Sequence, residues 1–253
     1  MFIRALSLLR NATQIVLCLC IAVTVSAWAQ VPPWPSKPVR LIVGFPGGST
    51  PDTAARALAE GLSKAWGQAV VVESKVGAAG NIAADVVAKA GDDHTLGVVI
   101  NGNLTTAKLL NPKLPYDPVK DLLPVSLIAT APLLLVASAD MPAGAAWVSA
   151  VRLAGDKLSY GSVGIGSVGH LGMEVIKSAL GNSGIVHVPY NGNPAVITAM
   201  LGAQVHMALM PPAVVMPQIR AGKLQAVGLA GAAQRHGPRC AVVGRCGSAH
   251  EPA

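Results

Sequence analysis

From Val39 onward, the chain alternates between two patterns of apolar and polar positions. Short, continuous apolar runs predict buried strands, and between them apolar residues recur every three or four positions, which predicts helices. The run VRLIVGF at 39–45 is the first such strand, and 52–66 is the helix that follows it. Near-continuous apolar strands separated by helices are typical of a parallel sheet that is covered on both faces.

The alternation occurs in two series, separated by a break at Leu114–Leu123 that is rich in proline and charge. The first series predicts strands at 39–45, 69–72 and 95–100 and helices at 52–66, 81–90 and 104–110. Two strand-like runs follow within 125–138, split at Ala131-Pro132. The second series predicts helices at 145–154, 167–180, 194–201 and 212–221 and strands at 158–161, 185–188, 204–210 and 224–229. We therefore expect two α/β lobes with a cleft between them, where such folds bind small molecules.

The amino terminus has the pattern of a secretory signal peptide. Arg4 and Arg10 precede an apolar stretch at Ile15–Val25, and Ala27-Trp28-Ala29 is a small-x-small cleavage pattern. The stretch is shorter than the roughly 20 residues that a membrane-spanning helix needs. We expect cleavage after Ala29 and export to the periplasm.

These patterns divide the chain into four parts: a signal peptide at 1–29, a first lobe at 30–125, a region at 126–232 that is mainly the second lobe with crossover segments, and an atypical tail at 233–253. Two of the four cysteines, Cys240 and Cys246, lie in that tail, and the predicted mature chain has none before it. No disulfide framework therefore holds the lobes, and a hydrophobic core must. Cys240 and Cys246 are left with two alternatives, free thiols or one small disulfide loop.

The composition, with 52% hydrophobic residues and 12% charged residues, supplies such a core. Nineteen Lys and Arg against twelve Asp and Glu give a formal net charge of +7. The basic residues are scattered singly and aromatic residues are few, at 4%. Nucleic-acid binding is therefore not expected.

Two glycine-rich turns, each between a strand and a helix, are the candidate binding elements. The first contains Gly47, Gly48, Ser49 and Thr50, with Asp52 as a helix cap. Glycines let backbone N–H groups converge, and the positive end of the following helix favours an anion. An ordinary tight turn is the alternative for this segment.

The second turn contains Ser162, Gly164, Gly166 and Ser167. Gly164–Gly169 matches the dinucleotide fingerprint GxGxxG, but the acidic residue expected about 20 positions later is replaced by Pro189-Tyr190-Asn191. We expect a second anion-binding helix start rather than a dinucleotide site. One such start in each lobe fits a small molecule with two negative groups, or with one carboxylate and a polar end.

Catalytic patterns are missing from the sequence. It contains no HExxH motif, no GxSxG elbow and no paired His/Cys cluster, so we expect no enzyme, no metal site and no cofactor. His170, just inside a predicted helix, is either a ligand contact or a satisfied helix-start histidine. Binding without chemistry is the favoured interpretation.

Several spaced motifs carry a family resemblance that covers about 34–231. They are PSKPVRLIVGFPGGSTPDTAARALAEGLSKAWGQAVVVESKVGAAGNIAADVVAKA, YGSVGIGSVGHLGMEVIK, VPYNGNPAVITAMLGAQV and AGKLQAVGLAG. In this order they resemble the Bug family, the extracytoplasmic solute receptors of tripartite tricarboxylate transporters. The resemblance implies a two-lobe periplasmic binding protein fold of type II, each lobe a mostly parallel sheet flanked by helices.

The resemblance also implies a ligand site between the lobes for a small organic carboxylate. The residues in ligand-facing segments are Gly47, Gly48, Ser49, Thr50, Asp52, Asn101, Asn103, Thr105, Ser162, Gly164, Gly166, Ser167, His170, Tyr190 and Asn191. His206 stands where the family commonly has an acidic residue. If that position faces the amino group of an amino-acid ligand, His206 argues against such a ligand.

The chain departs from the family at its end. Residues 234–253 (QRHGPRCAVVGRCGSAHEPA) show no secondary-structure period, whereas the family continues with a segment that braces the first lobe. We expect a truncated or frame-shifted tail that leaves the first sheet with an unpaired edge.

The leading hypothesis is a monomeric receptor that captures a carboxylate and delivers it to membrane permease subunits. The alternatives are a sensor that feeds a signalling system and, less favoured, a cleft enzyme in which Tyr190 and His170 act as acid and base.

Overall fold

The computed structural model describes residues 33–181, 184–230 and 239–245. Residues 37–253 form one compact unit, and residues 33–36 belong to another that covers 1–36. The predicted signal peptide and its cleavage site after Ala29 lie outside the described residues. Within the described ranges, no helix combines the length and the apolar character that crossing a membrane requires.

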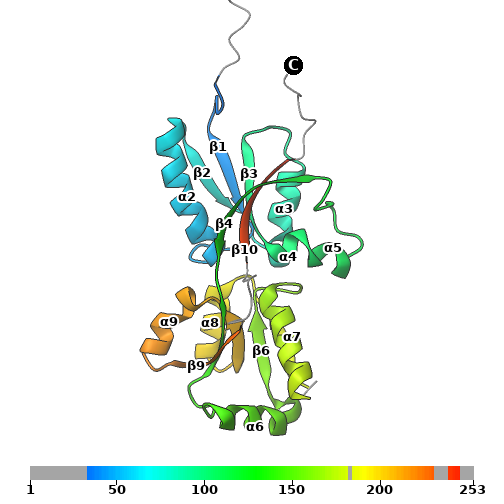
Figure 1. Ribbon diagram of the computed structural model, residues 1–253, viewed down its shortest axis with the longest axis vertical. Helices are drawn as coiled ribbons and strands as arrows, with labels where there is room; N and C mark the ends of the chain where they lie inside the picture. The colour runs from blue at the N-terminus through cyan, green and yellow to red at the C-terminus, as the bar shows by residue number, and fades with distance from the viewer. Residues whose placement is uncertain (1–32, 182–183, 231–238, 246–253) are drawn as a thin grey trace, which may run out of the picture. The chain divides into compact units, whose positions relative to one another are not determined.

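The first lobe is built on a five-stranded sheet in the order β2-β1-β3-β10-β4 (Figure 1). Its elements are β1 (Val39–Val43), α2 (Thr50–Trp66), β2 (Val70–Ser74), the 3-10 turn η1 (Ala78–Gly80), α3 (Asn81–Ala88), β3 (Thr95–Ile100), α4 (Asn101–Leu104), α5 (Thr106–Leu110), β4 (Leu122–Thr130) and β10 (Arg239–Arg245). Strands β2, β1 and β3 are parallel, and β10 is antiparallel to both β3 and β4.

The second lobe repeats this arrangement in the order β7-β6-β8-β5-β9. Its elements are β5 (Leu133–Ser138), α6 (Ala145–Ala154), η2 (Gly155–Lys157), β6 (Ser159–Ser162), α7 (Val168–Leu180), β7 (Val186–Pro189), α8 (Asn193–Leu201), β8 (Met207–Met210), α9 (Pro212–Arg220) and β9 (Leu224–Ala230). Strands β7, β6 and β8 are parallel, and β5 is antiparallel to β8 and β9. In each sheet four strands therefore run in one direction and one is reversed, so the predicted mostly parallel sheets are confirmed.

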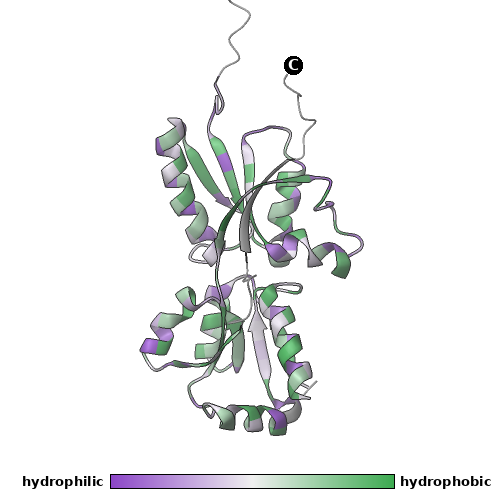
Figure 2. Ribbon diagram, viewed as in Figure 1, coloured by the Kyte–Doolittle hydropathy of each residue, from purple (hydrophilic) through white to green (hydrophobic). Residues whose placement is uncertain are grey.

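Each sheet is covered on both faces because its strands are apolar on both sides. In β1, Leu41 and Val43 pack with α2, and Ile42 between them packs with α3. In the second lobe one face packs against α6 and α7, and the other against α8 and α9. Figure 2 shows hydrophobic colour along the strands of the first sheet, and hydrophilic positions on the helices.

The reversed strand of the first sheet, β10, corrects the expectation for the tail. We expected no regular structure after residue 233, yet the backbone of Arg239–Arg245 pairs with β3 on one side and β4 on the other. The strand occupies the place that β5 has in the second sheet. Local periodicity is a poor guide here because a short central strand gains its stability from its two neighbours. Cys246 lies outside the described residues, as does the side chain of Cys240.

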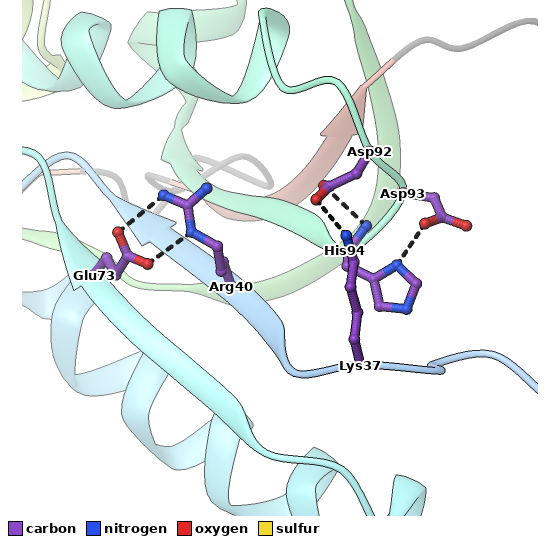
Figure 3. A network of polar contacts seen from close by, with 6 residues as sticks. All are labelled: Lys37, Arg40, Glu73, Asp92, Asp93 and His94. Carbon is purple, nitrogen blue, oxygen red and sulfur yellow. Dashed lines mark hydrogen bonds and ion pairs between the residues drawn. The ribbon is translucent and has the colours of Figure 1, made fainter.

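An ion-pair network joins the strands of the first sheet (Figure 3). Arg40 in β1 donates two hydrogen bonds to Glu73 in β2, with Nε–Oε1 at 2.7 Å and a second N–O distance of 3.0 Å. The Arg40 guanidinium lowers the pKa of Glu73. Lys37 pairs with Asp92 at 2.9 Å and lowers its pKa, and Asp92 also accepts the backbone N–H of His94. These partly exposed pairs align β1 with β2 and with the segment that leads into β3.

Substitution of Gly44 tests how closely the backbone packs at the carboxyl end of β1. A Cβ atom on Gly44 would lie 2.5 Å from the Cα of Gly80, so Gly44→Ala must push backbone against backbone. We expect a loss of about 1–3 kcal/mol in the free energy of unfolding, measured by urea titration. Gly61→Ala is the control, because its Cβ would meet no atom within 4 Å in an exposed turn of α2. There alanine should stabilise by about 0.5–1 kcal/mol, and equal effects at both positions would contradict the packing argument.

Candidate functional site

Each glycine-rich turn leads into a helix, as the sequence predicts, but the first helix begins earlier than expected: its N-cap is Ser49, and the predicted cap Asp52 lies in its first turn. Ser49 is the N-cap of α2, and its side chain accepts a hydrogen bond from the backbone N–H of Asp52. Ser167 is the N-cap of α7, and its side chain accepts from the N–H of His170. Both serines are 1% exposed. Each turn therefore carries a buried N-cap at the start of a helix, where the peptide dipoles present partial positive charge.

These two turns line one cavity of about 80 Å³, called the first cavity here. Its lining residues are Phe45, Ser49, Thr50, Pro51, Ile100, Asn101, Ala131, Leu133, Val163, Ser167, Val168, Gly169, Asn193, Leu209 and Pro211. They come from both lobes. Helices α8 and α9 also begin here, at Asn193 and just after Pro211. With the short helix α4, which begins at Asn101, five helix starts thus meet around a space in which no described lining residue carries a charged side chain.

Two polar atoms at the first cavity have no partner among the described residues. Thr50 Oγ1 and Asn101 Oδ1 are both buried and make no hydrogen bond there. Leaving a buried polar atom unpaired costs about 1–3 kcal/mol. A site that binds a polar ligand or ordered water offers such atoms a partner, which makes the first cavity the candidate site.

The other predicted residues of the first turn have structural partners. Asp52 is 2% exposed, and its Oδ2 accepts the backbone N–H of Gly48 at 3.0 Å. Arg56 pairs with Asp52 from the next turn of α2 at 3.0 Å. Gly48 lines a separate groove beside α8 and α9, and Gly47 is exposed. The Asp52 carboxylate therefore stabilises the turn by accepting a hydrogen bond from one of its backbone N–H groups.

Asn103 and Thr105 do not line the first cavity, and their side chains hydrogen-bond to neighbouring segments of the first lobe. Asn103 is 2% exposed, and its Nδ2 donates to the Ala79 carbonyl at 3.0 Å and to Asn81 Oδ1 at 2.8 Å. Ala79 has a left-handed backbone, with φ at 55°, which non-glycine residues adopt at a cost. The Asn103 amide holds that strained turn. Thr105 Oγ1 donates to the Asn101 carbonyl at 2.8 Å.

Three further predicted residues lie at a different cavity. Gly164, Tyr190 and Asn191 line what we call the second cavity, together with residues of η1 and α5. The loop from Val163 to Ser167 separates the two cavities, since its ends line the first cavity and Gly164 and Ile165 line the second. Of the predicted set, Ser49, Thr50, Asn101 and Ser167 line the first cavity, Gly164, Tyr190 and Asn191 line the second, and Gly48 lines the separate groove.

The lobes touch where this loop meets the first lobe. Thr106 Oγ1 donates to the Gly166 carbonyl at 2.8 Å. A Cβ on Gly102 would lie 2.9 Å from that same oxygen, and one on Gly164 would lie 2.6 Å from the Cβ of Ala79. Gly164 and Gly166 also have positive φ angles, 123° and 82°. Glycine is required here both by conformation and by the close approach of the two backbones.

Ser162 and His170 belong to what we call the buried cluster beneath the loop, in which Ser162 and Tyr160 are buried and His170 and His187 are partly buried. Ser162 Oγ lies 2.7 Å from His187 Nε2 and accepts the Gly164 N–H at 3.1 Å, while His170 Nδ1 accepts the Gly166 N–H at 3.2 Å. The His187 ring stacks on Tyr160, with centroids 4.8 Å apart, and lies 4.3 Å from the His170 ring. The cluster shapes the glycine turn, and neither Ser162 nor His170 lines the first cavity.

Burial controls the titration of this cluster. Burial, followed by the neighbouring His170, lowers the pKa of His187 to about 4. Burial likewise lowers the pKa of His170 and raises that of Tyr160, whose hydroxyl donates to Glu174. Among the described residues, no group of three His, Cys, Asp or Glu is arranged to hold a metal ion.

Sequence reasoning did not find Asn193, and it used His206 as an argument about the ligand. Asn193 is 8% exposed at the start of α8 and lines the first cavity, where we had named its neighbour Asn191. The available signal was the Asn-Pro pair, which is typical of a helix start. His206 precedes β8, and its Nδ1 accepts the Ser159 N–H at the amino end of β6. Because the carboxyl end of β8 leads to the first cavity, His206 lies at the other end of its strand and is no guide to the ligand.

Comparison with known proteins gives consistent matches. The family described as "Tripartite tricarboxylate transporter family receptor" matches residues 54–243, which include most of β10. A UPF0065 protein of Bordetella pertussis is 35% identical over 226 residues, covering 88% of this chain and 68% of the relative. Protein BugT of the same organism is 32% identical over 200 residues, covering 78% of this chain and 61% of its own length. The chain thus spans about two thirds or less of these two relatives.

Solved structures match over both lobes. The periplasmic binding protein BugD has a TM-score of 0.79 at 27% identity, covering 86% of this chain and 79% of that one. A protein of R. palustris, solved with adipate, has a TM-score of 0.79 at 30% identity with the same coverage. MatC of Rhodopseudomonas palustris, solved with bound malate, has a TM-score of 0.78 at 28% identity, covering 85% and 80%. The expected two-lobe periplasmic binding protein fold is confirmed.

His187 should make stability depend on pH. Its pKa is about 4 when folded against an ordinary value of 6.5, so between these values the unfolded chain binds a proton that the folded chain does not. Stability should therefore fall as pH drops from about 6.5 to about 4. Urea titrations across this range should show a shallower decline in His187→Asn. Val196→Ala, which removes buried apolar contact and no titratable group, is the control and should keep the wild-type slope. An unchanged slope in His187→Asn would contradict the assignment.

Proposed function

This chain belongs to the tripartite tricarboxylate transporter receptor family, and we propose that it is a periplasmic receptor for a small organic carboxylate that it delivers to membrane subunits of such a transporter. The observation that carries the proposal is the first cavity, where the starts of α2 and α7 from the two lobes meet around unpaired polar atoms. The known ligands of two similar structures, adipate and malate, are carboxylates and support the same class.

The chemistry of the first cavity suits a carboxylate without a basic side chain. Helix starts carry roughly half a positive charge each and leave backbone N–H groups for an anion. Ser49 and Ser167 already satisfy one donor at each helix, so the remaining N–H groups and the Thr50 hydroxyl are left to donate to a carboxylate, while Asn101 Oδ1 can accept from a hydroxyl or a water. Hydrogen bonds to an ionised oxygen are about twice as strong as neutral ones.

Binding would bridge the lobes and favour their closed arrangement. Ser49, Thr50 and Asn101 come from the first lobe, and Ser167 and Asn193 from the second. A ligand that contacts both sets stabilises the closed form by its differential affinity for the two arrangements. A receptor needs such a difference, because the membrane partner must distinguish the loaded from the empty form.

We also propose that binding occurs without turnover. The described residues that line the first cavity include no side chain able to transfer a proton near neutral pH. The two groups considered for acid–base work, Tyr190 and His170, are at the second cavity and in the buried cluster. A periplasmic location accords with the similar protein BugD and with the predicted signal peptide.

The proposal is tested by calorimetric titration and thermal melts of residues 30–253 with adipate, malate, succinate and citrate. A bound acid at 100 times its dissociation constant should add about 2.7 kcal/mol to stability. It should be recovered unchanged, with one molecule bound per chain. Absence of binding by every acid in a protein that melts cooperatively would contradict the receptor function.

Thr50→Val tests the role of the unpaired hydroxyl. Valine keeps the shape of Thr50 and removes Oγ1, which makes no hydrogen bond among the described residues, so folding stability should change little. A lost hydrogen bond to an ionised ligand should weaken binding by roughly tenfold to a hundredfold. Thr53→Val makes the same change on the next turn of α2, outside the first cavity, and should leave affinity unchanged. Equal affinities in the two variants would exclude Thr50 as a ligand contact.

A further inference from the structure

We infer that His170 is a positioning residue for ligand binding: its neutral imidazole holds Gly166 in the conformation that accepts the hydrogen bond from Thr106 of the first lobe. Ligand binding is therefore linked to the loss of a proton from His170. The inference rests on the proposed function, because it concerns the affinity of the same receptor. His170 itself lines neither cavity and acts through the contact between the lobes.

The hydrogen bond between Gly166 and His170 fixes the protonation state of the imidazole. The Gly166 backbone N–H donates to Nδ1 of His170, with an N–N distance of 3.2 Å. A backbone N–H can only donate, so Nδ1 must carry a lone pair and no proton. A proton added to the ring would occupy Nδ1 and set two donors against each other. The Gly166 N–H, in a buried part of the loop, would then lose this partner, which is unfavourable.

Gly166 connects this imidazole to the first lobe. Its N–H donates to His170, and its carbonyl accepts from Thr106 Oγ1 at 2.8 Å. Glycine has no intrinsic preference for the φ of 82° that Gly166 adopts, so the two hydrogen bonds hold it there. The next residue, Ser167, lines the first cavity. A change in the Gly166 conformation therefore reaches both the contact between the lobes and the ligand site.

The groups that face His170 oppose its protonation. His170 lies in the first turn of α7, where the helix dipole disfavours positive charge, and the ring of His187 from β7 lies 4.3 Å away. Glu174 would favour a charged imidazole, but its Oε1 already accepts from Tyr160 in β6 and from Lys177. Burial, as the largest cause, and the Lys177 charge lower the pKa of His170, and they outweigh Glu174.

The linkage has a definite sign. Above the pKa of His170 the imidazole is neutral and both hydrogen bonds of Gly166 form. Below that pKa the receptor must first release a proton, so affinity should fall as the pH drops. By reciprocity, a bound ligand should lower the pKa of His170. A direct electrostatic effect of an anionic ligand has the opposite sign, because a nearby negative charge stabilises the imidazolium and raises its pKa.

A magnetic resonance titration of the histidine rings in residues 30–253 tests the sign. It compares the empty protein with the protein saturated by the tightest binder among adipate, malate, succinate and citrate, and the His170 signal is the one that His170→Asn lacks. We expect the ligand to lower the pKa of His170. An unchanged or raised pKa in a saturated protein would overturn the inference while the receptor function stands. Absence of binding by all four acids would overturn the receptor function, and the inference with it.

His170→Leu and His206→Leu separate this role from a merely structural one. Both histidines accept a backbone N–H through Nδ1, His170 at the contact between the lobes and His206 at the amino end of β6, at 3.1 Å. Calorimetric titration at pH 8 should show about tenfold weaker binding in His170→Leu, which loses a buried hydrogen bond. His206→Leu loses the same kind of bond away from the contact and should keep the wild-type affinity. Equal affinities in the two variants would overturn the inference.

His170→Asn keeps the acceptor and removes the titration. Its Oδ1 occupies the place of Nδ1 and gains no proton near neutral pH. It should restore the affinity that His170→Leu loses, and the wild-type affinity should fall relative to it as the pH is lowered from 8 to about 5. The comparison at each pH cancels the ionisation of the ligand. Identical pH profiles in His170→Asn and the wild type would overturn the linkage, and this variant serves if His170→Leu does not fold.

Thr106→Val tests the path through Gly166. Valine keeps the shape of Thr106 and removes the hydroxyl that donates to the Gly166 carbonyl. If His170 acts through Gly166, Thr106→Val and His170→Leu should each weaken binding by about tenfold, and the double variant should lose no more than about threefold beyond either. A loss in the double variant equal to the product of the two single losses would overturn the positioning role.

Discussion

The hydrogen bond from Thr106 to the Gly166 carbonyl marks the constraint on which the site depends. At this point two backbones approach so closely that a Cβ on Gly102 or Gly164 would collide with the opposite lobe. Such an approach requires glycine at Gly102 and Gly164, and it holds the loop Val163–Ser167 against η1 and α5. The first cavity exists on one side of that contact and the second on the other.

Around this contact the protein concentrates partial positive charge with no basic residue among the described lining of the first cavity. Five helices start there; the side chains of Ser49 and Ser167 satisfy one N–H group each in α2 and α7, whereas α8 and α9 have no side-chain cap. A lysine or arginine would bind an anion more strongly and release it more slowly. Fixed dipoles and neutral amides bind an anion with a modest desolvation cost, which would suit the receptor function proposed above.

The buried cluster of Ser162, His187, His170 and Tyr160 contains side chains that fix the conformation of the second glycine-rich turn. The sequence predicts Ser162 and His170 as ligand residues because they lie in and after a glycine-rich turn. Their side chains hydrogen-bond to the amides of Gly164 and Gly166, whose conformations the lobe contact requires. Asn103 plays the corresponding part in the first lobe, where its amide holds the strained turn at Ala79.

The sequence by itself determined the order and type of most elements before the tail, the two-lobe α/β architecture, and the helices that follow the two glycine-rich turns, although it placed the first helix cap at Asp52 and not at Ser49. These follow from periodicity and capping, which involve residues within a few positions of one another. Only the tertiary structure decided that β10 enters the first sheet, that Asn193 and not Asn191 reaches the first cavity, and that His206 lies at the far end of its strand. Each of these depends on pairing or contact between segments distant in the chain. Local periodicity does not indicate which distant segments pair with one another.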